Sequence, residues 1–388
     1  MIRKVSFRNF KAYRSLDMEL EPLTVLVGPN ASGKTTLLEG LLLIANTSQE
    51  VMSNARTYCL EPSPVRSYGS KEPVELSVVG EWAGVGGVVV ASSGASEVQG
   101  QDGRPALIFK VSGTWDEKAF FVGDWREKEP AADPGRHLYG KLGWEPLQKL
   151  RAELSSTAIL QFESAKLAAP SYSEERIPRI RPDGAGLASV LANLKLSQDE
   201  IFERIGSALR EVVPAVRRVR IERAQLQQDA HTINEVGVRK VWGDQLVLDM
   251  QGAKGVAAHA VGEGTLMALG LLTVLLAPPF PRLVLLDDIE LKLHPVAQAR
   301  LIEVLRVLQK SDAGLQVLAT SHSPFILNYL DPKEVRMTFL AENGFARCEK
   351  LTAHPEFEKW KDLMSPGEFW STVGESWLEK VGEPSAHK

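Results

Sequence analysis

The sequence has only two cysteines, Cys59 and Cys348, and neither lies in a metal-binding spacing. This excludes a disulfide framework and a cysteine-ligated zinc site, and it suits a reducing compartment. Long hydrophobic runs are missing as well, because the most apolar stretch, residues 266–280, is too short to cross a bilayer. The first residues, Met1 to Lys4, precede a strand rather than the apolar core of a signal peptide. We therefore expect a cytoplasmic protein that has no membrane partner.

An excess of positive charge is also lacking. The 45 lysines and arginines are outnumbered by 49 acidic residues, and the formal net charge is −4 at pH 7. A nucleic-acid partner would therefore contact a local basic patch, since no global positive field attracts it. The sequence contains no internal repeat, low-complexity tract or heptad run, which excludes solenoids and long coiled coils. The length fits one α/β domain with insertions or two to three smaller domains.

One short motif organises the chain. Residues 28–35 match the G-x-x-x-x-G-K-[ST] pattern of a phosphate-binding P-loop, with an apolar strand at 23–27 before it and a helix-forming run at 36–44 after it. The backbone N–H groups of such a loop bind nucleotide phosphates, while Lys34 reaches the β- and γ-phosphates and Thr35 is a ligand of Mg²⁺. The predicted nucleotide-binding residues of this region are Gly28, Pro29, Asn30, Ala31, Ser32, Gly33, Lys34, Thr35 and Thr36.

A second motif supplies carboxylates. Residues 283–288 read Leu-Val-Leu-Leu-Asp-Asp, which indicates a buried strand that ends in two acidic side chains. In P-loop enzymes this Walker B pattern provides one carboxylate for Mg²⁺ and one that polarises the attacking water. We assign Asp287 to the metal and Asp288 to the water. A later apolar strand, residues 316–321, is followed by His322, which we interpret as a sensor of the γ-phosphate.

These motifs, in this order, resemble those of ATP-binding-cassette (ABC) ATPases, in the soluble branch that contains the SMC, RecF and OLD-family head domains. The resemblance rests on five stretches: Arg8 to Lys11, Gly28 to Thr35, Val261 to Thr265, Leu283 to Pro295 and Thr320 to Pro324. It implies an α/β P-loop NTPase, an ABC-type head with a mixed core sheet, an antiparallel β lobe and a helical lobe. It also implies a head-to-tail homodimer that buries two ATP molecules, each between the P-loop of one subunit and the signature motif of the other.

The same resemblance gives roles to further residues. It makes His322 the switch histidine and Gln161 the glutamine that contacts Mg²⁺ or water, although Gln161 is equally consistent with an ordinary polar residue at a strand end. The signature residues that meet the γ-phosphate in trans are Gly262, Glu263, Gly264 and Thr265.

Two positions depart from the family pattern. Gly262 stands where the family has a serine, and Asp288 stands where it usually has a glutamate, which is one methylene longer. Glu290 is therefore a further catalytic candidate, and slow turnover is expected.

The predicted organisation is a single discontinuous ATPase head over residues 1–388. Residues 1–50 and 240–345 form its nucleotide-binding core, 51–160 a β-rich insertion, 161–239 a helical and basic lobe, and 346–388 a C-terminal helical tail. The aromatic residues of this tail are expected to pack on the core rather than to form an exposed docking stripe. They are Trp360, Phe369, Trp370 and Trp377.

The sequence leaves the task of the ATPase open. Residues 323–388 are too few for an appended Toprim nuclease, so any nuclease would be a separate chain. One hypothesis is an ATPase that binds double-stranded DNA in repair or anti-phage defence and controls a separately encoded nuclease or other effector. The alternative is an ATP-dependent protein-interaction switch that regulates an effector without contacting nucleic acid. A transporter subunit is disfavoured by the signature segment and by the β-rich insertion.

Arginines provide local support for DNA binding. They are concentrated in the region between the insertion and the signature segment, and the candidates are Arg176, Arg179, Arg181, Arg217, Arg218 and Arg220. Such a group fits a groove that binds phosphates. It fits equally well a solvated face that is balanced by neighbouring glutamates. Salt-dependent DNA binding would separate the two interpretations.

Overall fold

The computed structural model describes residues 1–54, 59–60, 67–70, 74–81, 88–99, 105–115, 118–122, 154, 156–232, 235–312 and 314–380. The chain divides into two compact units. The first comprises Met1–Thr157, Arg282–Ile289 and Asp312–Lys388, and the second comprises Ala158–Pro281 and Glu290–Ser311. The P-loop, the Walker B carboxylates and His322 all belong to the first unit, whereas the signature segment and Gln161 belong to the second.

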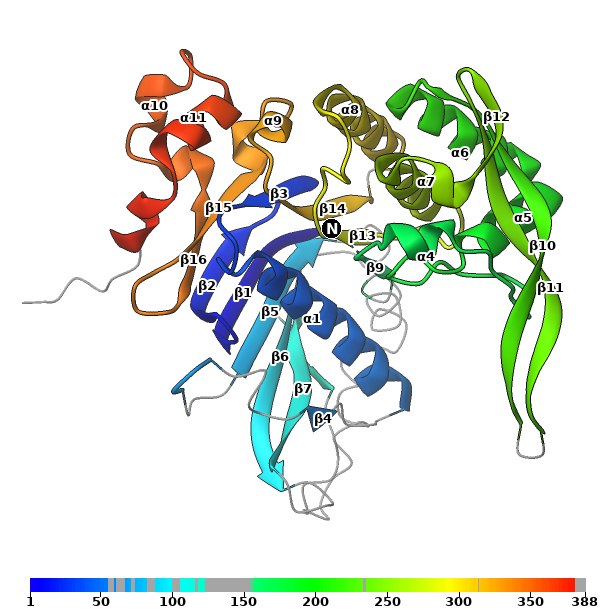
Figure 1. Cartoon of the computed structure of the whole chain (residues 1–388). Coiled ribbons are helices and arrows are strands. Elements are labelled where there is room, and N and C mark those ends of the chain that lie inside the picture. Colours follow the sequence, from blue (N-terminus) through cyan, green and yellow to red (C-terminus); the bar gives the residue numbers. More distant parts are fainter. Residues whose placement is uncertain are drawn as a thin grey trace, which may run out of the picture. The chain divides into compact units, whose positions relative to one another are not determined.

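An antiparallel sheet forms one layer of the first unit (Figure 1). Its strands follow the order β2-β1-β5-β6-β7-β4, and β8 pairs with β7. The first two strands form an N-terminal hairpin, in which Phe7 and Leu16 face each other across β1 and β2 and are both buried. The strands are β1 (Ile2–Phe10), β2 (Tyr13–Glu19), β4 (Cys59–Leu60), β5 (Val74–Glu81), β6 (Val88–Gln99), β7 (Pro105–Trp115) and β8 (Lys118–Val122).

A mixed sheet carries the nucleotide-binding motifs in the same unit. Its strands are β3 (Leu23–Val27), β13 (Leu283–Leu286), β14 (Gln316–Ser321), β15 (Val335–Leu340) and β16 (Ala346–Lys350), in the order β16-β15-β3-β14-β13. The four strands from β15 to β13 run parallel, and β16 pairs antiparallel with β15. Every residue of β3, β13 and β14 is buried, which explains why these strands are continuous apolar runs in the sequence. The predicted fold class is confirmed.

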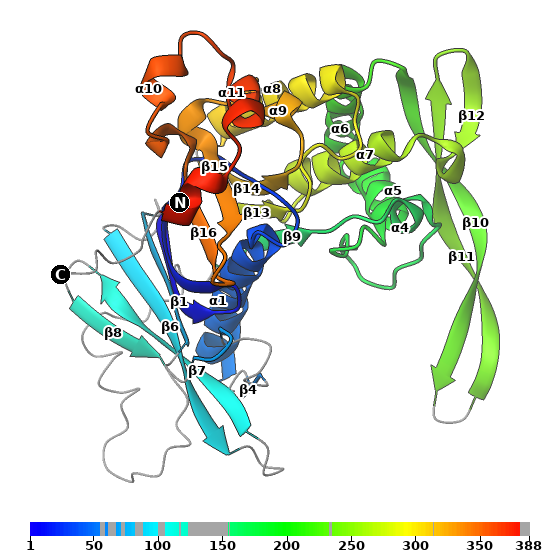
Figure 2. The same ribbon diagram turned by 60° about the vertical axis from the view of Figure 1, so that its left-hand side comes forward.

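Helix α1 (Lys34–Asn54) contacts strands of both sheets (Figures 1 and 2). Gly40 allows this packing, because a Cβ atom there would lie 2.4 Å from Cζ of Phe7. The helix is longer than the predicted run at 36–44. The prediction ended early because the apolar periodicity stops at Ala45, although the polar residues that follow keep the helical backbone.

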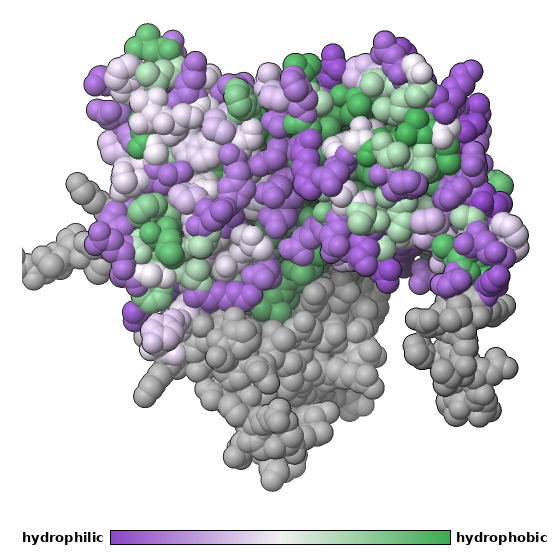
Figure 3. All heavy atoms as spheres, in the orientation of Figure 1, coloured by the Kyte–Doolittle hydropathy of each residue, from purple (hydrophilic) through white to green (hydrophobic). Residues whose placement is uncertain are grey.

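The C-terminal segment of the first unit is mostly helical. It contains α9 (Pro324–Leu327), η2 (Pro332–Glu334), η3 (Leu351–Ala353), α10 (Phe357–Trp360), α11 (Pro366–Val373) and η4 (Ser376–Lys380). Phe369 and Trp370 are buried, and the ring of His354 packs edge-on against both Phe369 and Trp377. The prediction that the tail aromatics pack inward is therefore confirmed for these residues. In Figure 3 the α10–α11 region is mostly pale, which marks intermediate hydropathy, with hydrophilic residues along its edge and a hydrophobic residue at its top.

The second unit combines helices with a long two-stranded ribbon (Figure 2). Its elements are β9 (Thr157–Leu160), α4 (Ser164–Ala168), α5 (Leu187–Ser197), α6 (Asp199–Val212), β10 (Val216–Thr232), β11 (Glu235–Met250), β12 (Ala253–Ala257), η1 (Ala258–Ala260), α7 (Glu263–Leu276) and α8 (Pro295–Ser311). β10 continues well beyond Ile221, where its apolar residues become sparse. Polar side chains follow on both faces, because backbone pairing with β11 needs no apolar alternation.

No helix within the described ranges is long and apolar enough to cross a membrane.

Candidate nucleotide-binding site

The P-loop joins β3 to α1, and two of its glycines are required by the backbone. Gly28 has a φ of +149° and Gly33 a φ of +97°, which are values that favour glycine. Neighbouring strands also leave no room for a side chain. A Cβ atom on Gly28 would lie 2.2 Å from the carbonyl oxygen of Thr338, and one on Gly33 would lie 2.8 Å from Cβ of Ala346. The P-loop is therefore seated directly against β15 and β16.

Lys34 lies within this loop rather than in solvent. The residue is buried, and its Nζ atom donates hydrogen bonds to the carbonyl oxygens of Gly28, at 2.8 Å, and Pro29, at 2.7 Å. Two carbonyl oxygens that face one ammonium group are a weaker anchor than a phosphate, because charge-assisted bonds to an anion are stronger. The amine is thus already aimed at the interior of the loop, where a phosphate would replace the carbonyl oxygens.

The hydroxyl of Thr338 supports the P-loop from β15. Its Oγ1 atom lies 3.0 Å from the carbonyl oxygen of Val27 and donates to it, and it lies 2.6 Å from Oγ of Ser32. Because the Thr338 proton is used on Val27, the Ser32 hydroxyl donates the second bond. Both side chains are buried. One hydroxyl therefore ties the strand before the loop to the loop itself.

The Walker B carboxylates follow β13, and Thr320 of β14 holds them. The Thr320 hydroxyl donates to Oδ1 of Asp287 at 2.7 Å and accepts the backbone N–H of Asp288 at 2.8 Å. The carbonyl oxygen of Thr320 accepts the N–H of Ile289 at 2.9 Å. Asp288 has a φ of +56°, a left-handed conformation that costs a residue other than glycine free energy. Three bonds to one residue thus keep this turn in place.

His322 follows the end of β14 and lies near the second carboxylate. Its Nε2 atom is 3.9 Å from Oδ1 of Asp288. The Asp288 side chain is 60% exposed and that of His322 is 41% exposed, so water and a ligand can reach both groups. The two groups form an ion pair when the imidazole is protonated.

The strand register brings these groups to one edge of the sheet. Ser321 pairs with Val27 across β14 and β3, and Leu286 pairs with Ala319 across β13 and β14. The carboxyl ends of the three parallel strands therefore meet at the same edge. Two strand spacings separate β13 from β3, which amounts to roughly 10 Å. The structure thus brings together the predicted P-loop, Asp287, Asp288 and His322.

The signature segment opens α7 in the second unit. Gly262 is the N-cap residue, and a Cβ atom placed on it would meet nothing within 4 Å. Gly264 is enclosed instead, because its Cβ atom would lie 2.8 Å from the carbonyl oxygen of Lys292. Thr265 is buried and donates its backbone N–H to the carbonyl oxygen of Gly262.

Glu263, also in the signature segment, takes part in a small polar network. Its carboxylate accepts hydrogen bonds from Nζ of Lys292, at 2.5 Å, and from Oγ of Ser164, at 2.9 Å. These two donors, Lys292 first, hold the pKa of the Glu263 carboxyl below its usual range. Leu291 and Lys292 both have a positive φ, so this turn against α7 is a left-handed one like that of Asp288.

The remaining predicted residues lie in the second unit. Gln161 follows β9 and is exposed, and its backbone N–H donates to the carbonyl oxygen of Pro182. Glu290 is half-buried. Five of the six candidate arginines are exposed: Arg176, Arg179, Arg181, Arg217 and Arg218. Arg220 is half-buried and forms ion pairs with Glu222, at 3.2 Å, and with Asp249, at 3.7 Å.

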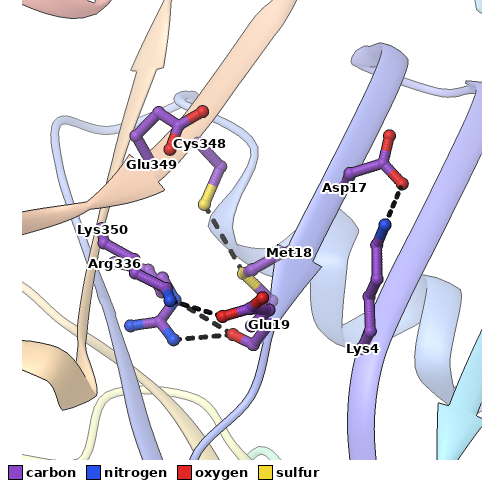
Figure 4. Close-up of a pocket in the computed structure, with 8 residues that line it drawn as sticks. All are labelled: Lys4, Asp17, Met18, Glu19, Arg336, Cys348, Glu349 and Lys350. Carbon is purple, nitrogen blue, oxygen red and sulfur yellow. Dashed lines mark hydrogen bonds and ion pairs between the residues drawn. The ribbon is translucent and has the colours of Figure 1, made fainter. Parts of the chain in front are cut away.

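A cavity elsewhere in the first unit is lined by charged side chains (Figure 4). Its volume is about 350 Å³, and it lies between β2 and β16. The lining residues are Lys4, Asp17, Met18, Glu19, Arg336, Cys348, Glu349 and Lys350. Most of their charges are already used: Lys350 pairs with Glu19 at 2.5 Å, and Lys4 pairs with Asp17 at 3.1 Å.

The buried groups beside this cavity have structural roles. Arg336 is almost fully buried and donates to backbone carbonyl oxygens, including two bonds to that of Glu19. Burial lowers the pKa of its guanidinium and raises the pKa of the Cys348 thiol to about 12. The thiol therefore stays protonated at neutral pH and is a poor nucleophile.

The sequence did not predict Thr320 and Thr338 as site residues, although Thr320 begins the matching stretch Thr320 to Pro324. Tyr13, which a Cβ atom on Gly33 would approach to 3.0 Å, was not predicted either. The hairpin of β15 and β16 was also missed. Alternation of Val335, Met337 and Phe339 is a signal for a strand, but a hydroxyl that faces a loop from a neighbouring strand leaves no signature in the sequence.

Two models of known families match parts of this chain. A family model described as "AAA domain, putative AbiEii toxin, Type IV TA system" matches residues 128–328, and one described as "AAA ATPase domain" matches residues 1–78.

Curated relatives match over short stretches. The DNA replication and repair protein RecF of Roseiflexus castenholzii is 49% identical over 47 residues, which is 12% of each chain. The OLD nuclease of Thermus scotoductus is 30% identical over 78 residues, which is 20% of this chain and 14% of the nuclease. This chain thus matches only about an eighth of the length of either relative.

Solved structures match over nearly the whole chain. An SMC head bound to the C-winged helix domain of ScpA has a TM-score of 0.55 at 15% identity, and the match covers 92% of this chain and 99% of that one. An SMC head with an extended coiled coil, bound to the C-terminal domain of ScpA from Pyrococcus furiosus, has a TM-score of 0.54 at 14% identity, and the match covers 93% and 99%. At this identity the likeness concerns the fold. Because the first family model covers more than half of the 388 residues, the chain belongs to the AAA-domain family that it describes and is an ATPase of the SMC, RecF and OLD-like type.

Proposed function

We propose that this chain binds Mg²⁺ and ATP at the P-loop edge of the first unit and hydrolyses the nucleotide with Asp288 and His322. The observation that supports the proposal most directly is that one sheet edge carries a buried lysine aimed into the P-loop, a held carboxylate and an exposed carboxylate beside a histidine. These groups correspond to phosphate binding, metal binding and water activation.

The residues present fit Mg²⁺. Thr35 and Asp287 offer hard oxygen donors at this edge, and the remaining ligands would come from phosphates and water, as is usual for this ion. No group of three His, Cys, Asp or Glu side chains suited to a metal ion occurs among the residues that the structure describes. When bound, Mg²⁺ neutralises phosphate charge. Gln161 remains our proposed contact to the metal or its water.

Different groups of the chain have different roles in the proposed reaction. The backbone N–H groups of residues 30–36, at the N-terminus of α1, bind the phosphates, and Lys34 exchanges its carbonyl partners for phosphate oxygens. The exposed carboxylate of Asp288 accepts a proton from water, while His322 contacts the γ-phosphate. Glu290 is the second candidate base.

We further propose that two chains associate head to tail and enclose two ATP molecules. The signature segment would supply the contacts in trans. Its support is the free space at Gly262 and the position of this residue at the N-terminus of α7, where backbone N–H groups favour an anion. Glu263 and Thr265 would border the same phosphate. The predicted division of the chain into core, β-rich insertion, helical lobe and tail, with boundaries at residues 51, 161, 240 and 346, remains part of this proposal.

For the partner, we propose double-stranded DNA, with a separately encoded nuclease or other effector, in repair or defence against phage. The support is the stretch shared with RecF and the OLD nuclease, together with the exposed arginines of the second unit. Arg217 and Arg218 are the best phosphate ligands, whereas Arg220 is held by Asp249.

A second candidate function is a protein-interaction switch that regulates an effector and does not bind DNA. The specific observation in its favour is the description of the matching family, which names a toxin of a toxin–antitoxin system rather than a DNA-binding protein. The ATP chemistry is the same in both candidates.

Mass measurements in solution test these proposals. Lys34→Ala is expected to lose ATP binding, whereas Asp288→Ala is expected to keep it and to accumulate as an ATP-bound dimer. The molar mass of Asp288→Ala is measured with and without ATP and Mg²⁺, and then with a short DNA duplex present. If ATP doubles the molar mass and the dimer binds the duplex, the first candidate is supported. If the dimer forms but does not bind the duplex, the second candidate is supported.

Matched variants complete the test. Charge reversal of Arg217 and Arg218 should abolish duplex binding without changing the mass of the ATP dimer. Lys359→Glu, at an exposed lysine on α10 of the first unit, is the control. Wild-type turnover by Asp288→Ala would refute the assignment of the catalytic carboxylate.

A further inference from the structure

Two buried threonine hydroxyls flank the strand that enters the P-loop. Thr320 lies on β14 and Thr338 on β15, and these strands are the two neighbours of β3 in the mixed sheet. Both residues are fully buried, at 0% exposure. A buried hydroxyl that lacks a hydrogen-bond partner destabilises the fold, so buried hydroxyls are normally bonded. The partners of each hydroxyl therefore indicate which part of the site it supports. The partners of these two hydroxyls differ.

The hydroxyl of Thr338 bonds, within the described part of the chain, to the P-loop side. Its hydroxyl joins the carbonyl oxygen of Val27, which is the last residue of β3, to the hydroxyl of Ser32 inside the loop. Its backbone also borders the loop, because the Thr338 carbonyl oxygen fills the space that a side chain on Gly28 would need. Every one of these contacts concerns the conformation of the phosphate-binding loop.

Among the described residues, the hydroxyl of Thr320 bonds to the Walker B side. Its hydroxyl donates to one oxygen of Asp287, which orients the other oxygen, and it accepts the N–H of Asp288. The second bond stabilises the left-handed backbone of Asp288, which directs that carboxylate toward His322. All of these contacts concern groups that handle metal and water.

We propose that Thr338 and Thr320 are positioning residues with separate duties. Thr338 fixes the P-loop for phosphate binding, and Thr320 fixes the two carboxylates for metal-dependent hydrolysis. The inference rests on the proposed ATP site, and it deepens it: the two halves of the site are supported independently from opposite sides of β3. A purely structural role would make both hydroxyls matter for stability alone.

Valine is the informative substitution, because it keeps the branched shape of threonine and removes the hydroxyl. Thr338→Val should weaken ATP binding in EDTA by about ten-fold, because it removes two buried hydrogen bonds, and it should leave the Mg²⁺ concentration for half-maximal turnover unchanged. Thr320→Val should leave ATP binding in EDTA within about two-fold but raise that Mg²⁺ concentration by about ten-fold and lower kcat. Serine at either position retains the hydroxyl and should restore the affected parameter.

The measurements are calorimetric ATP titration in EDTA, Mg²⁺ titration of turnover at saturating ATP, and the melting temperature of each variant. A lowered melting temperature with unchanged ATP and Mg²⁺ parameters would overturn the proposal, as would loss of the same parameter in both variants. Ser32→Ala removes only the Ser32 bond of the Thr338 hydroxyl, so it should weaken ATP binding in EDTA by less than Thr338→Val does. The double variant should be no weaker than Thr338→Val alone. Additive losses in this pair would contradict the shared contact.

Failure of the ATP site itself has a different signature. In that case the wild-type protein does not bind ATP, or Lys34→Ala binds it as tightly as the wild type does. If the wild type binds ATP normally but the two valine variants affect the same parameter, the inference about the threonines is rejected and the proposed ATP site is not.

Discussion

The two glycine-containing loops that we propose to meet ATP differ in how tightly the protein encloses them. Gly28 and Gly33 of the P-loop have positive φ angles and no room for a Cβ atom. Gly262 of the signature segment has an ordinary φ of −56° and open space around it, and only Gly264 is enclosed. Glycine is therefore a backbone requirement in the first loop. At Gly262 it is a replaceable residue, and substitutions test this difference directly.

Gly28→Ala should have the largest effect. The new Cβ atom would meet the carbonyl oxygen of Thr338, and the backbone would have to leave its φ of +149°. We expect ATP affinity to fall by about a hundred-fold, equivalent to strain of about 3 kcal/mol. Calorimetric titration measures the loss. Gly344→Ala is the control, since Gly344 has a φ of +80° but no atom within 4 Å of its Cβ position, and it should bind ATP normally.

Gly264→Ala should have an intermediate effect, confined to association. A methyl group there would push against the carbonyl oxygen of Lys292 and disturb the Lys292–Glu263 pair. Alanine favours a helix over glycine by about 1 kcal/mol, so the fold should tolerate the change. We expect ATP binding to one chain to persist and the ATP-dependent dimer to weaken by about ten-fold, the equivalent of about 1.4 kcal/mol. Light scattering over a concentration series measures this. Gly206→Ala on α6 should change neither quantity.

Gly262→Ser should have the smallest effect, and it should be favourable. The site is open, and serine is a preferred N-cap residue that exceeds glycine by only a few tenths of a kcal/mol. The hydroxyl restores the family's usual group at the proposed trans contact, so we expect the ATP dimer to tighten by about three-fold. A weaker dimer in the same light-scattering series would show that this segment does not face the nucleotide.

Much of the fold was accessible from the sequence because its signals are local. The P-loop strand, the Walker B strand and the strand before His322 are continuous apolar runs, and burial on both faces requires such runs. The N-terminal hairpin alternates with a period of two, and α6 ends before Pro214, which cannot continue a helix. The fold class followed from the order of these elements.

The parts that the sequence did not reveal depend on contacts between distant residues. Thr338 and Ser32 lie 306 positions apart, and neither residue type signals that it will meet the other. The extension of β10 is held by its pairing with β11 rather than by its own pattern. The arginines illustrate the same limit, because only the structure shows that Arg220 pairs with Asp249 while Arg217 and Arg218 are exposed.

Three residues between positions 288 and 292 have a left-handed backbone, and this limits how far the region can be stabilised without loss of activity. Asp288, Leu291 and Lys292 each have a positive φ, where glycine would relieve strain of about 1 kcal/mol. Yet each side chain has a contact: Asp288 lies near His322, Leu291 is buried, and Lys292 pairs with Glu263. A thermostability screen that selects glycine at these positions would therefore be expected to enrich for inactive proteins.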